Sequence, residues 1–348
     1  MNRPEARLRR SGLGVGVMIA ATLLAGCGGA GTGAETELIV PSGATFAEVV
    51  DTLTARGLVA RPLFFRVYAR LRGDDTQVRS GRYTFRGGDG WGTMLDALVA
   101  GRVVTVPFTI PEGWTLRQMV DRLAQATGES PEAVRAYLDD EAQHQRWGVP
   151  GPGLEGYLFP DTYRFAEGSS LEAVIEAMVD RYQAFWTPER RERLEALGLT
   201  EREVVTLASI VQAEARVSEE MPSIASVYHN RVLRGWRLEA DPTVLYALGG
   251  PRERLLYAAI DSVANNPYNT YRQEGIPPGP IGAPGEAALD ATLNPVDAPF
   301  LFFVARPGGR HVFTRTLAEH NRAKAQARRE FDALQRGQVS EDVSERNN

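Results

Sequence analysis

A glutamate at position 214 is the residue of this sequence best placed to do acid–base chemistry. It ends the segment TLASIVQAE, residues 206–214, which predicts a helix. At 3.6 residues per turn, Glu214 shares a helix face with Leu207, Ile210 and Val211. Burial against that face would raise the pKa of the carboxyl toward the range of a general acid. The alternative is that Glu214 lies at the solvent-exposed edge of this apolar face and has no catalytic role, since structural carboxylates outnumber catalytic ones.

The composition is that of an ordinary globular protein. The chain has 348 residues, 43% hydrophobic and 24% charged, with a net charge of −5, and its length allows about two domains. That charge gives no reason to expect nucleic acid as a partner. The sequence contains no HExxH, CxxC or G-x-S-x-G motif, and its four histidines lack metal-ligand spacing. We therefore expect no metal and no cofactor.

Residues 1–27 have the pattern of an export leader. Four arginines precede an uncharged stretch, residues 11–34, whose apolar part from Leu13 to Ala25 is shorter than a comfortable membrane span. The leader ends in LAGC, which resembles the lipobox of bacterial lipoproteins, and Cys27 is the lone cysteine. This predicts lipidation at Cys27; an uncleaved anchor helix is the alternative. In either case the chain is exported and held at a membrane, because the positive charges stay on the cytoplasmic side.

The order of expected elements predicts an α+β protein. After a flexible tether at 28–36, residues 37–110 predict the order strand, helix, helix, strand, helix and strand, which indicates a small α+β module. The first part of this module resembles a LysM-like fold, which grips glycan in many cell-wall proteins; a plain spacer domain is the alternative. The rest divides into a helical connector at 111–151, a larger mixed α/β catalytic domain at 152–336 and a disordered polar tail at 337–348. Within that domain, Thr200 with Glu203 predicts a capping box at the start of the helix that carries Glu214. The turn residues at 307–309 predict a hairpin between a strand at 300–305 and residues 311–313.

Two segments have side chains that suit sugars. Residues 264–285 form a long proline-rich loop that includes Tyr268, Asn269, Thr270 and Tyr271, and a loop of this length inside a compact domain usually has a function. A similar mixture of hydroxyls and rings occurs at 156–163. For each segment alone, turn chemistry plus core aromatics is a sufficient explanation. Together with a carboxyl on a helix face, they favour a carbohydrate-binding cleft.

Several motifs then identify a family resemblance. The chain closely resembles the YceG-like endolytic murein transglycosylase family, over residues 38–335, through motifs that keep the family's order. These are LEGYLFPDTY (154–163), ASIVQAE (208–214), DPTV (241–244), YNTY (268–271), GIPPGPI (275–281), NP (294–295) and FFV (302–304). The resemblance implies a membrane-anchored enzyme that cuts nascent peptidoglycan inside the strand and leaves 1,6-anhydro-N-acetylmuramic acid ends. It implies peptidoglycan glycan strands as substrate and makes peptidoglycan synthases candidate partners.

The resemblance also assigns residues. The family's catalytic acid maps to Glu214, and the acidic position that precedes it in the family motif is Gln212 here. Gln212 cannot exchange a proton and points to roughly the opposite helix face, so the sequence concentrates the acid–base role on Glu214. Asp161 is more simply interpreted as a turn residue, and Asp241 is more simply interpreted as a helix cap. The predicted substrate-binding residues are Glu155, Tyr157, Asp161, Asp241, Tyr268, Asn269, Thr270 and Tyr271.

One carboxyl is enough for the implied chemistry. Ordinary glycosidases use two carboxyls, whereas in a lytic transglycosylase the 6-hydroxyl of the muramic acid attacks its own anomeric carbon, with a large gain in effective concentration. Two alternatives stay open: a hydrolytic muramidase, and a non-catalytic peptidoglycan-binding lipoprotein. The expected location is the inner (cytoplasmic) membrane, with the catalytic domain on the periplasmic side; an outer-membrane lipoprotein is the less favoured alternative.

Overall fold

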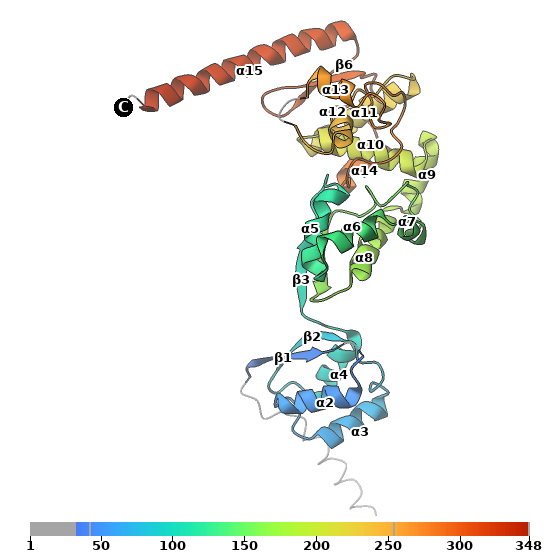
Figure 1. The fold of residues 1–348 in the computed structure, drawn as a ribbon, viewed down its shortest axis with the longest axis vertical. Coiled ribbons are helices and arrows are strands. Elements are labelled where there is room, and N and C mark those ends of the chain that lie inside the picture. Colours follow the sequence, from blue (N-terminus) through green and yellow to red (C-terminus); the bar gives the residue numbers. More distant parts are fainter. Residues whose placement is uncertain (1–32, 42, 253–254, 347–348) are drawn as a thin grey trace, which may run out of the picture. The chain divides into compact units, whose positions relative to one another are not determined.

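The computed structural model describes residues 33–41, 43–252 and 255–346 (Figure 1). The chain forms two compact units. Unit 1 contains the described residues through Val106 together with Arg164–Glu167, and unit 2 contains Pro107–Tyr163 and the residues from Gly168 onward. The predicted leader, including Cys27, lies outside the described residues.

Unit 1 has the element order strand, helix, helix, strand, helix. The elements are β1 (Glu35–Val40), α2 (Phe46–Ala55), α3 (Pro62–Arg72), β2 (Gly81–Arg86) and α4 (Trp91–Ala100). β1 and β2 pair antiparallel, with Glu35 opposite Arg86 and Val40 opposite Gly81. The structure thus confirms the order of elements that the sequence predicts for this part of the chain, while the likeness to a LysM fold remains a prediction.

The strands of unit 1 bury alternate residues. Leu38 and Val40 of β1 face inward with Tyr83 and Phe85 of β2, and all four are at most 4% exposed, as the two-residue period of a strand requires. Helices α2, α3 and α4 supply the rest of this core. Thr45 starts α2 through a reciprocal capping box with Glu48, which satisfies backbone donors at the helix start.

Strands β3 (Thr105–Thr109) and β4 (Thr162–Ala166) form a two-stranded sheet. The chain passes from one unit to the other within each of these strands, after Val106 and after Tyr163. Unit 2 is otherwise mainly helical. Its further elements are α5 (Leu116–Thr127), α6 (Pro131–Asp139), α7 (Glu141–Trp147), α8 (Leu171–Phe185), α9 (Pro188–Leu197), α10 (Glu201–Glu214), η2 (Ser218–Glu220), α11 (Met221–Leu233), α12 (Asp241–Ala247), α13 (Tyr257–Ser262), α14 (Glu286–Leu293), β5 (Phe302–Ala305), β6 (His311–Thr314) and α15 (Leu317–Arg346).

Helix α10 lies at the centre of unit 2. It packs against both α11 and α14, and every residue from Val204 to Val211 is buried. Its two sides belong to different core clusters, one shared with α11 and the other with α8. A helix buried over most of its circumference holds its last residue in a fixed position, because core side chains pack at crystal-like density.

The α+β class is confirmed, but unit 2 differs in detail from the expected mixed α/β domain. Each sheet in the described residues has two strands, and β5 and β6 form the antiparallel hairpin that the sequence predicts. The helices of the predicted connector, α5 to α7, belong to unit 2. Helix α15 continues to Arg346, through the segment expected to be a disordered tail; residues 337–346 contain no proline to end it.

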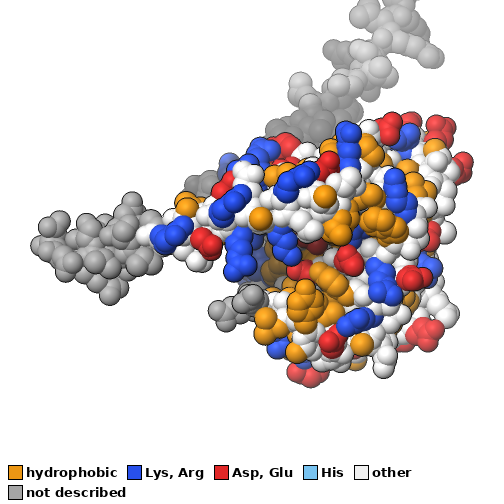
Figure 2. Space-filling view, turned by 90° about the horizontal axis from the view of Figure 1, so that it is seen from above, with side chains coloured by type: hydrophobic (Ala, Val, Ile, Leu, Met, Phe, Trp, Pro, Cys, Tyr) orange, Lys and Arg blue, Asp and Glu red, His pale blue; other side chains and the backbone are white. Residues whose placement is uncertain are grey.

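No helix in the part of the chain that the structure describes is both long and apolar enough to cross a membrane. The face of the molecule shown in Figure 2 carries Lys and Arg side chains interspersed with Asp, Glu and hydrophobic ones. This face therefore presents a mixture of charges rather than a field of one sign.

Candidate active site

Glu214 is the last residue of α10. Thr200 begins the helix with a capping box to Glu203, as predicted. Leu207, Ile210 and Val211, which share a face with Glu214, are all 0% exposed, so the predicted apolar stripe is confirmed. Glu214 itself is only partly buried. The helix therefore presents a carboxyl at the end of a fully apolar face, where solvent and a ligand can still reach it.

The surroundings of Glu214 shift its pKa. The hydroxyl of Tyr228, on α11, donates a hydrogen bond of 3.1 Å to Oε1 of Glu214. Burial raises the pKa of Glu214 to about 7, the Tyr228 hydrogen bond lowers it, the charge of Asp241 raises it and the charge of Arg231 lowers it. A carboxyl with this pKa is part protonated and part ionised near neutral pH, which suits a group that both gives and takes a proton.

Asp241 and Tyr271 form a pair in the same environment. The Tyr271 hydroxyl donates a 2.6 Å hydrogen bond to Oδ1 of Asp241. The prediction of Asp241 as a helix cap is wrong: it is the first residue of α12, the N-cap is Ala240, and no side chain caps the helix. The charge of Asp241 acts on both Glu214 and Tyr271 and raises the pKa of each. The structure thus places a second carboxylate within electrostatic reach of Glu214.

The segment before α12 is held in a strained conformation. Glu239 has a φ of 47° and is the one non-glycine residue in the described part of the chain with a positive φ. Such a backbone conformation costs free energy and persists only where the surroundings impose it. Thr270 imposes it from the long loop: its carbonyl accepts from Glu239 N at 3.2 Å and its hydroxyl accepts from Ala240 N at 3.0 Å. The loop at 264–285 therefore fixes the position of Asp241.

The C-terminal part of the same loop forms hydrogen bonds with α10. Ile281 N donates to Oγ of Ser209 at 3.0 Å, and Gly285 N donates to Oε1 of Gln212 at 3.0 Å. Gln212 and Glu214 thus contact different elements, as predicted from their helix positions. The amide at 212 positions the loop, and this role was missed in the sequence because its partner is more than seventy residues away.

Glu155 is a second carboxyl with a raised pKa. Its Oε1 accepts from Leu116 N at 3.0 Å and its Oε2 accepts from the Tyr246 hydroxyl at 3.2 Å. Burial raises the pKa of Glu155 to about 7, while these two hydrogen bonds and the charge of Arg117 lower it. The ring of Tyr246 packs on Tyr268, with centroids 4.9 Å apart. Glu155 therefore links the start of α5 to α12, the helix that begins with Asp241.

The family is established by comparison. The model of the YceG-like family matches residues 38–326. The chain belongs to the YceG-like family. The match covers most of the described residues of both units, and it confirms the resemblance inferred from the motifs. Among the described residues of this YceG-like chain, no group of three or more His, Cys, Asp or Glu could hold a metal ion.

Similar proteins share most of the chain. A Bacillus subtilis (strain 168) protein named endolytic murein transglycosylase is 32% identical over 301 residues, which cover 82% of each protein. A protein of the same name from Streptococcus pneumoniae (strain D39) is 29% identical over 317 residues, covering 82% of this chain and 57% of that protein. The crystal structure of a YceG-like protein from Listeria monocytogenes is 28% identical with a TM-score of 0.56, covering 84% of this chain and 99% of that chain.

Three predicted sugar contacts of this YceG-like chain are corrected. Tyr157 and Asn269 are 0% exposed and Thr270 is 1% exposed, so their side chains have no surface to offer a glycan. Tyr157 packs edge-on against Tyr182 in the core, and the amide of Asn269 donates to the carbonyls of Ile260 and Val263. The sequence pattern identified residues of the loop but could not tell which of them face inward.

Asp161 is also better explained by structure. Its carboxylate accepts from Thr162 N at 2.7 Å and pairs with Arg181 at 3.0 Å. Arg181 in turn pairs with Glu286 at the start of α14. This exposed ion-pair chain ties the turn before β4 to two helices, in agreement with the simpler interpretation of Asp161 as a turn residue. The predicted residues that the structure groups around Glu214 and Glu155 are Asp241, Tyr268 and Tyr271.

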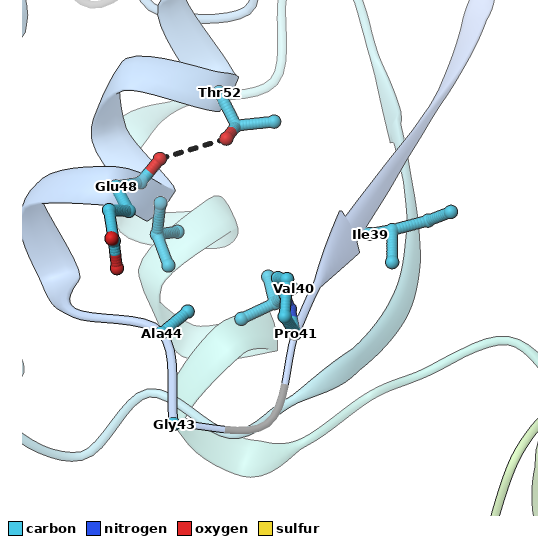
Figure 3. Close-up of a pocket in the computed structure, with 8 residues that line it drawn as sticks. Ile39, Val40, Pro41, Gly43, Ala44, Glu48 and Thr52 are labelled. Atoms are coloured by element: carbon cyan, nitrogen blue, oxygen red, sulfur yellow. Dashed lines mark hydrogen bonds between the residues drawn. The ribbon is translucent and has the colours of Figure 1, made fainter.

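A pocket of about 430 Å³ lies in unit 1 and has a different character. It is lined by Ile39, Val40, Pro41, Gly43, Ala44, Glu48, Val49 and Thr52 (Figure 3). Its carboxyl, Glu48, is used in the capping box with Thr45, and those hydrogen bonds lower the pKa of Glu48. An ionised, capped carboxylate is a poor proton donor, so this pocket is not a second candidate for acid catalysis.

Proposed function

We propose that this protein is an endolytic peptidoglycan transglycosylase. It cleaves the β-1,4 bond between N-acetylmuramic acid and N-acetylglucosamine without water and leaves 1,6-anhydro-N-acetylmuramic acid ends. The observation that carries the proposal is the environment of Glu214: a partly exposed carboxyl at the end of an apolar helix face, with its pKa raised to about 7. The names of the Bacillus and Streptococcus relatives support the same activity.

In the proposed reaction Glu214 acts twice. Its protonated form gives a proton to the glycosidic oxygen, and the bond from that oxygen to the anomeric carbon of the muramic acid breaks. The 6-hydroxyl oxygen of the same sugar then bonds to the anomeric carbon and gives its proton to the Glu214 carboxylate. The net reaction consumes no water and returns Glu214 to its starting state. Because the attacking hydroxyl is part of the substrate, the reaction needs no second base.

Neighbouring groups divide the supporting roles. The hydrogen bond from Tyr228 occupies Oε1 of Glu214 and leaves Oε2 for the substrate. Asp241, held by Tyr271, stabilises the positive charge that develops on the sugar ring in the transition state. The partly exposed rings of Tyr268 and Tyr271 are the candidate contacts for sugar faces.

A hydrolytic muramidase is the second candidate, and Asp241 is the observation that favours it. A second carboxylate close enough to influence the pKa of Glu214 is also what a two-carboxyl glycosidase has, with one acid and one base or nucleophile. The two reactions differ in their products. A hydrolase leaves an intact reducing end, whereas a transglycosylase leaves an end lighter by one water.

The test is digestion of purified sacculi with the wild-type protein, Glu214→Gln and Glu219→Gln, followed by mass spectrometry of the fragments. Glu219 is an exposed glutamate of the adjacent η2 segment and serves as the matched control. We expect anhydro ends from the wild type and Glu219→Gln, and none from Glu214→Gln. Intact reducing ends would select the muramidase. Sacculi left uncut by the wild type would support the non-catalytic peptidoglycan-binding lipoprotein.

Membrane attachment and the role of unit 1 complete the proposal. The leader and Cys27 predict that the protein is held at the inner membrane by its N-terminus, and the strand–helix–helix–strand order of unit 1 supports a LysM-like, glycan-gripping module. The mass of the mature N-terminal peptide distinguishes a diacylated Cys27 from a retained leader. The Glu214→Gln variant is expected to leave sacculi uncut, so its binding to purified sacculi measures the affinity of the protein for peptidoglycan directly.

A further inference from the structure

Helix α3 of unit 1 carries an apolar stripe on its outer side. Leu63, Phe64, Val67 and Leu71 are 73%, 55%, 57% and 83% exposed. Leu63, Val67 and Leu71 are four residues apart and so lie along one line of the helix, with Phe64 beside them. The opposite side, with Phe65, already packs into the core. A helix that is apolar on both sides normally belongs to a buried environment, so the outer stripe requires an explanation.

The charges of α3 are all of one sign. The helix contains no acidic residue, and arginines occur at its N-cap and at three positions along it, Arg61, Arg66, Arg70 and Arg72. Arg66 and Arg70 follow Leu63 and Val67 by three residues, which places them along one border of the stripe. Arg66 pairs with Asp51 at 2.6 Å, and Arg72 pairs with Asp74 and Asp96. Arg61 and Arg70 have no ion pair among the described residues. Long cationic side chains beside an apolar stripe can lay their methylene stems on an apolar layer and keep their charge in the headgroup region.

The length of the chain before unit 1 limits what can face α3. Strand β1 begins at Glu35, so residues 28–34 alone separate it from Cys27. Fully extended, such a segment spans at most about 30 Å. If the leader holds the chain at a membrane, as the proposed function states, unit 1 stays within roughly its own diameter of the lipid surface.

We propose that the outer stripe of α3 lies in the interface of an anionic bilayer. Leu63, Phe64, Val67 and Leu71 enter the boundary between headgroups and acyl chains, and Arg61 and Arg70 contact lipid phosphates. A bilayer accounts for the apolar stripe, for these two cations beside it and for the short tether at once. A second copy of the chain would bring the same two cations and therefore repulsion.

The experiment uses the full chain reconstituted through its own N-terminus into vesicles of phosphatidylglycerol and phosphatidylethanolamine. An environment-sensitive fluorescent amino acid replaces Leu71, and some lipids carry a nitroxide quencher just below the headgroup. The matched control places the same probe at Thr84, an exposed β2 residue on the face of the sheet away from the core that α2 and α3 share. We expect strong quenching at position 71 and little at position 84.

Two changes should reverse the quenching without detaching the protein. In vesicles of phosphatidylcholine alone, or in the variant Leu63→Ser with Val67→Ser, quenching at position 71 should fall to the level at position 84.

Equal quenching at the two positions in the wild-type background, while the protein still floats with the vesicles, would overturn the α3 proposal and leave the attachment intact. Protein that does not float would instead refute the attachment. Self-association that disappears in the serine variant would assign the stripe to a second copy and also overturn the proposal. Sacculus digestion tests catalysis separately.

Discussion

The hydroxyl of Tyr228 donates to Oε1 of Glu214 across 3.1 Å, from one helix to the end of another. This contact stabilises the ionised form of the carboxyl, whereas burial stabilises the protonated form. The pKa of about 7 is the balance of the two. Tyr228 was not identified from the sequence, because nothing in a helix segment rich in Ile, Ala and Val indicates which carboxyl its ring will meet.

Removing the Tyr228 hydroxyl should change the pH dependence of catalysis. In Tyr228→Phe the carboxylate loses its donor, so the pKa of Glu214 rises further above its ordinary value. If Glu214 must be protonated to start the reaction, the alkaline limb of the rate profile moves to higher pH by about one pH unit. The measurement is the release of anhydro-muropeptides between pH 5 and 9. An unchanged alkaline limb would contradict the assignment of that limb to Glu214.

Asp241→Asn should move the same limb in the opposite direction. The negative charge of Asp241 raises the pKa of Glu214, so its neutralisation lowers that pKa. For each pH unit of decrease, the protonated fraction on the alkaline side drops about tenfold. Asparagine retains an oxygen that can accept from Tyr271, so the loop stays in place. A limb that shifts to higher pH in this variant would show that Asp241 does not act through its charge.

Glu214→Gln should stabilise the fold at alkaline pH. In the unfolded chain the carboxyl has a pKa near 4.5, and in the folded protein it is about 7. The folded state binds more protons between these values, so the free energy of unfolding of the wild type falls as pH rises through this window. At pH 8 the variant should be more stable by up to roughly 3 kcal/mol, and near pH 4 the two should agree. Urea denaturation at both pH values measures this, and Glu219→Gln should show no such difference.

Tyr157→Phe should leave catalysis intact. The ring is fully buried, and its hydroxyl has no hydrogen-bond partner among the described residues, so its removal leaves no donor or acceptor stranded. We expect turnover of sacculi close to that of the wild type and a change in the free energy of unfolding within about 1 kcal/mol. Tyr271→Phe, which removes the partner of Asp241, is the contrasting variant and should lower turnover. Loss of activity in Tyr157→Phe would restore its predicted role as a sugar contact.

Ser209→Ala should loosen the loop that carries the sugar-binding candidates. The buried Ile281 N–H would lose its acceptor, at a cost of about 1–3 kcal/mol. Hydrogen exchange at residues 275–285 should become faster than in the wild type. Ser262→Ala, whose exposed hydroxyl bonds within its own helix, is the control. Unchanged exchange at Ile281 would mean that other contacts fix the loop.

The sequence alone determined the local features of this protein. Helical spacing put Glu214 at the end of an apolar face, the pairing of Thr200 with Glu203 set the start of α10, and turn chemistry at 307–309 predicted the β5–β6 hairpin. These features depend on neighbours within a few residues, so a linear pattern contains them. The ordered set of motifs also identified the family, since seven short segments in one order are far more specific than any one of them.

Only the tertiary structure decided which of the candidate residues face the site. Asn269 and Thr270 turn inward while Tyr271 reaches Asp241, although the residues are consecutive. Glu155 has a raised pKa because Tyr246 and the start of α5 enclose it. Burial and hydrogen bonds between groups tens of residues apart fix both outcomes, and such contacts arise from how whole helices pack. Spacing along the chain therefore found the acid, and packing selected its partners.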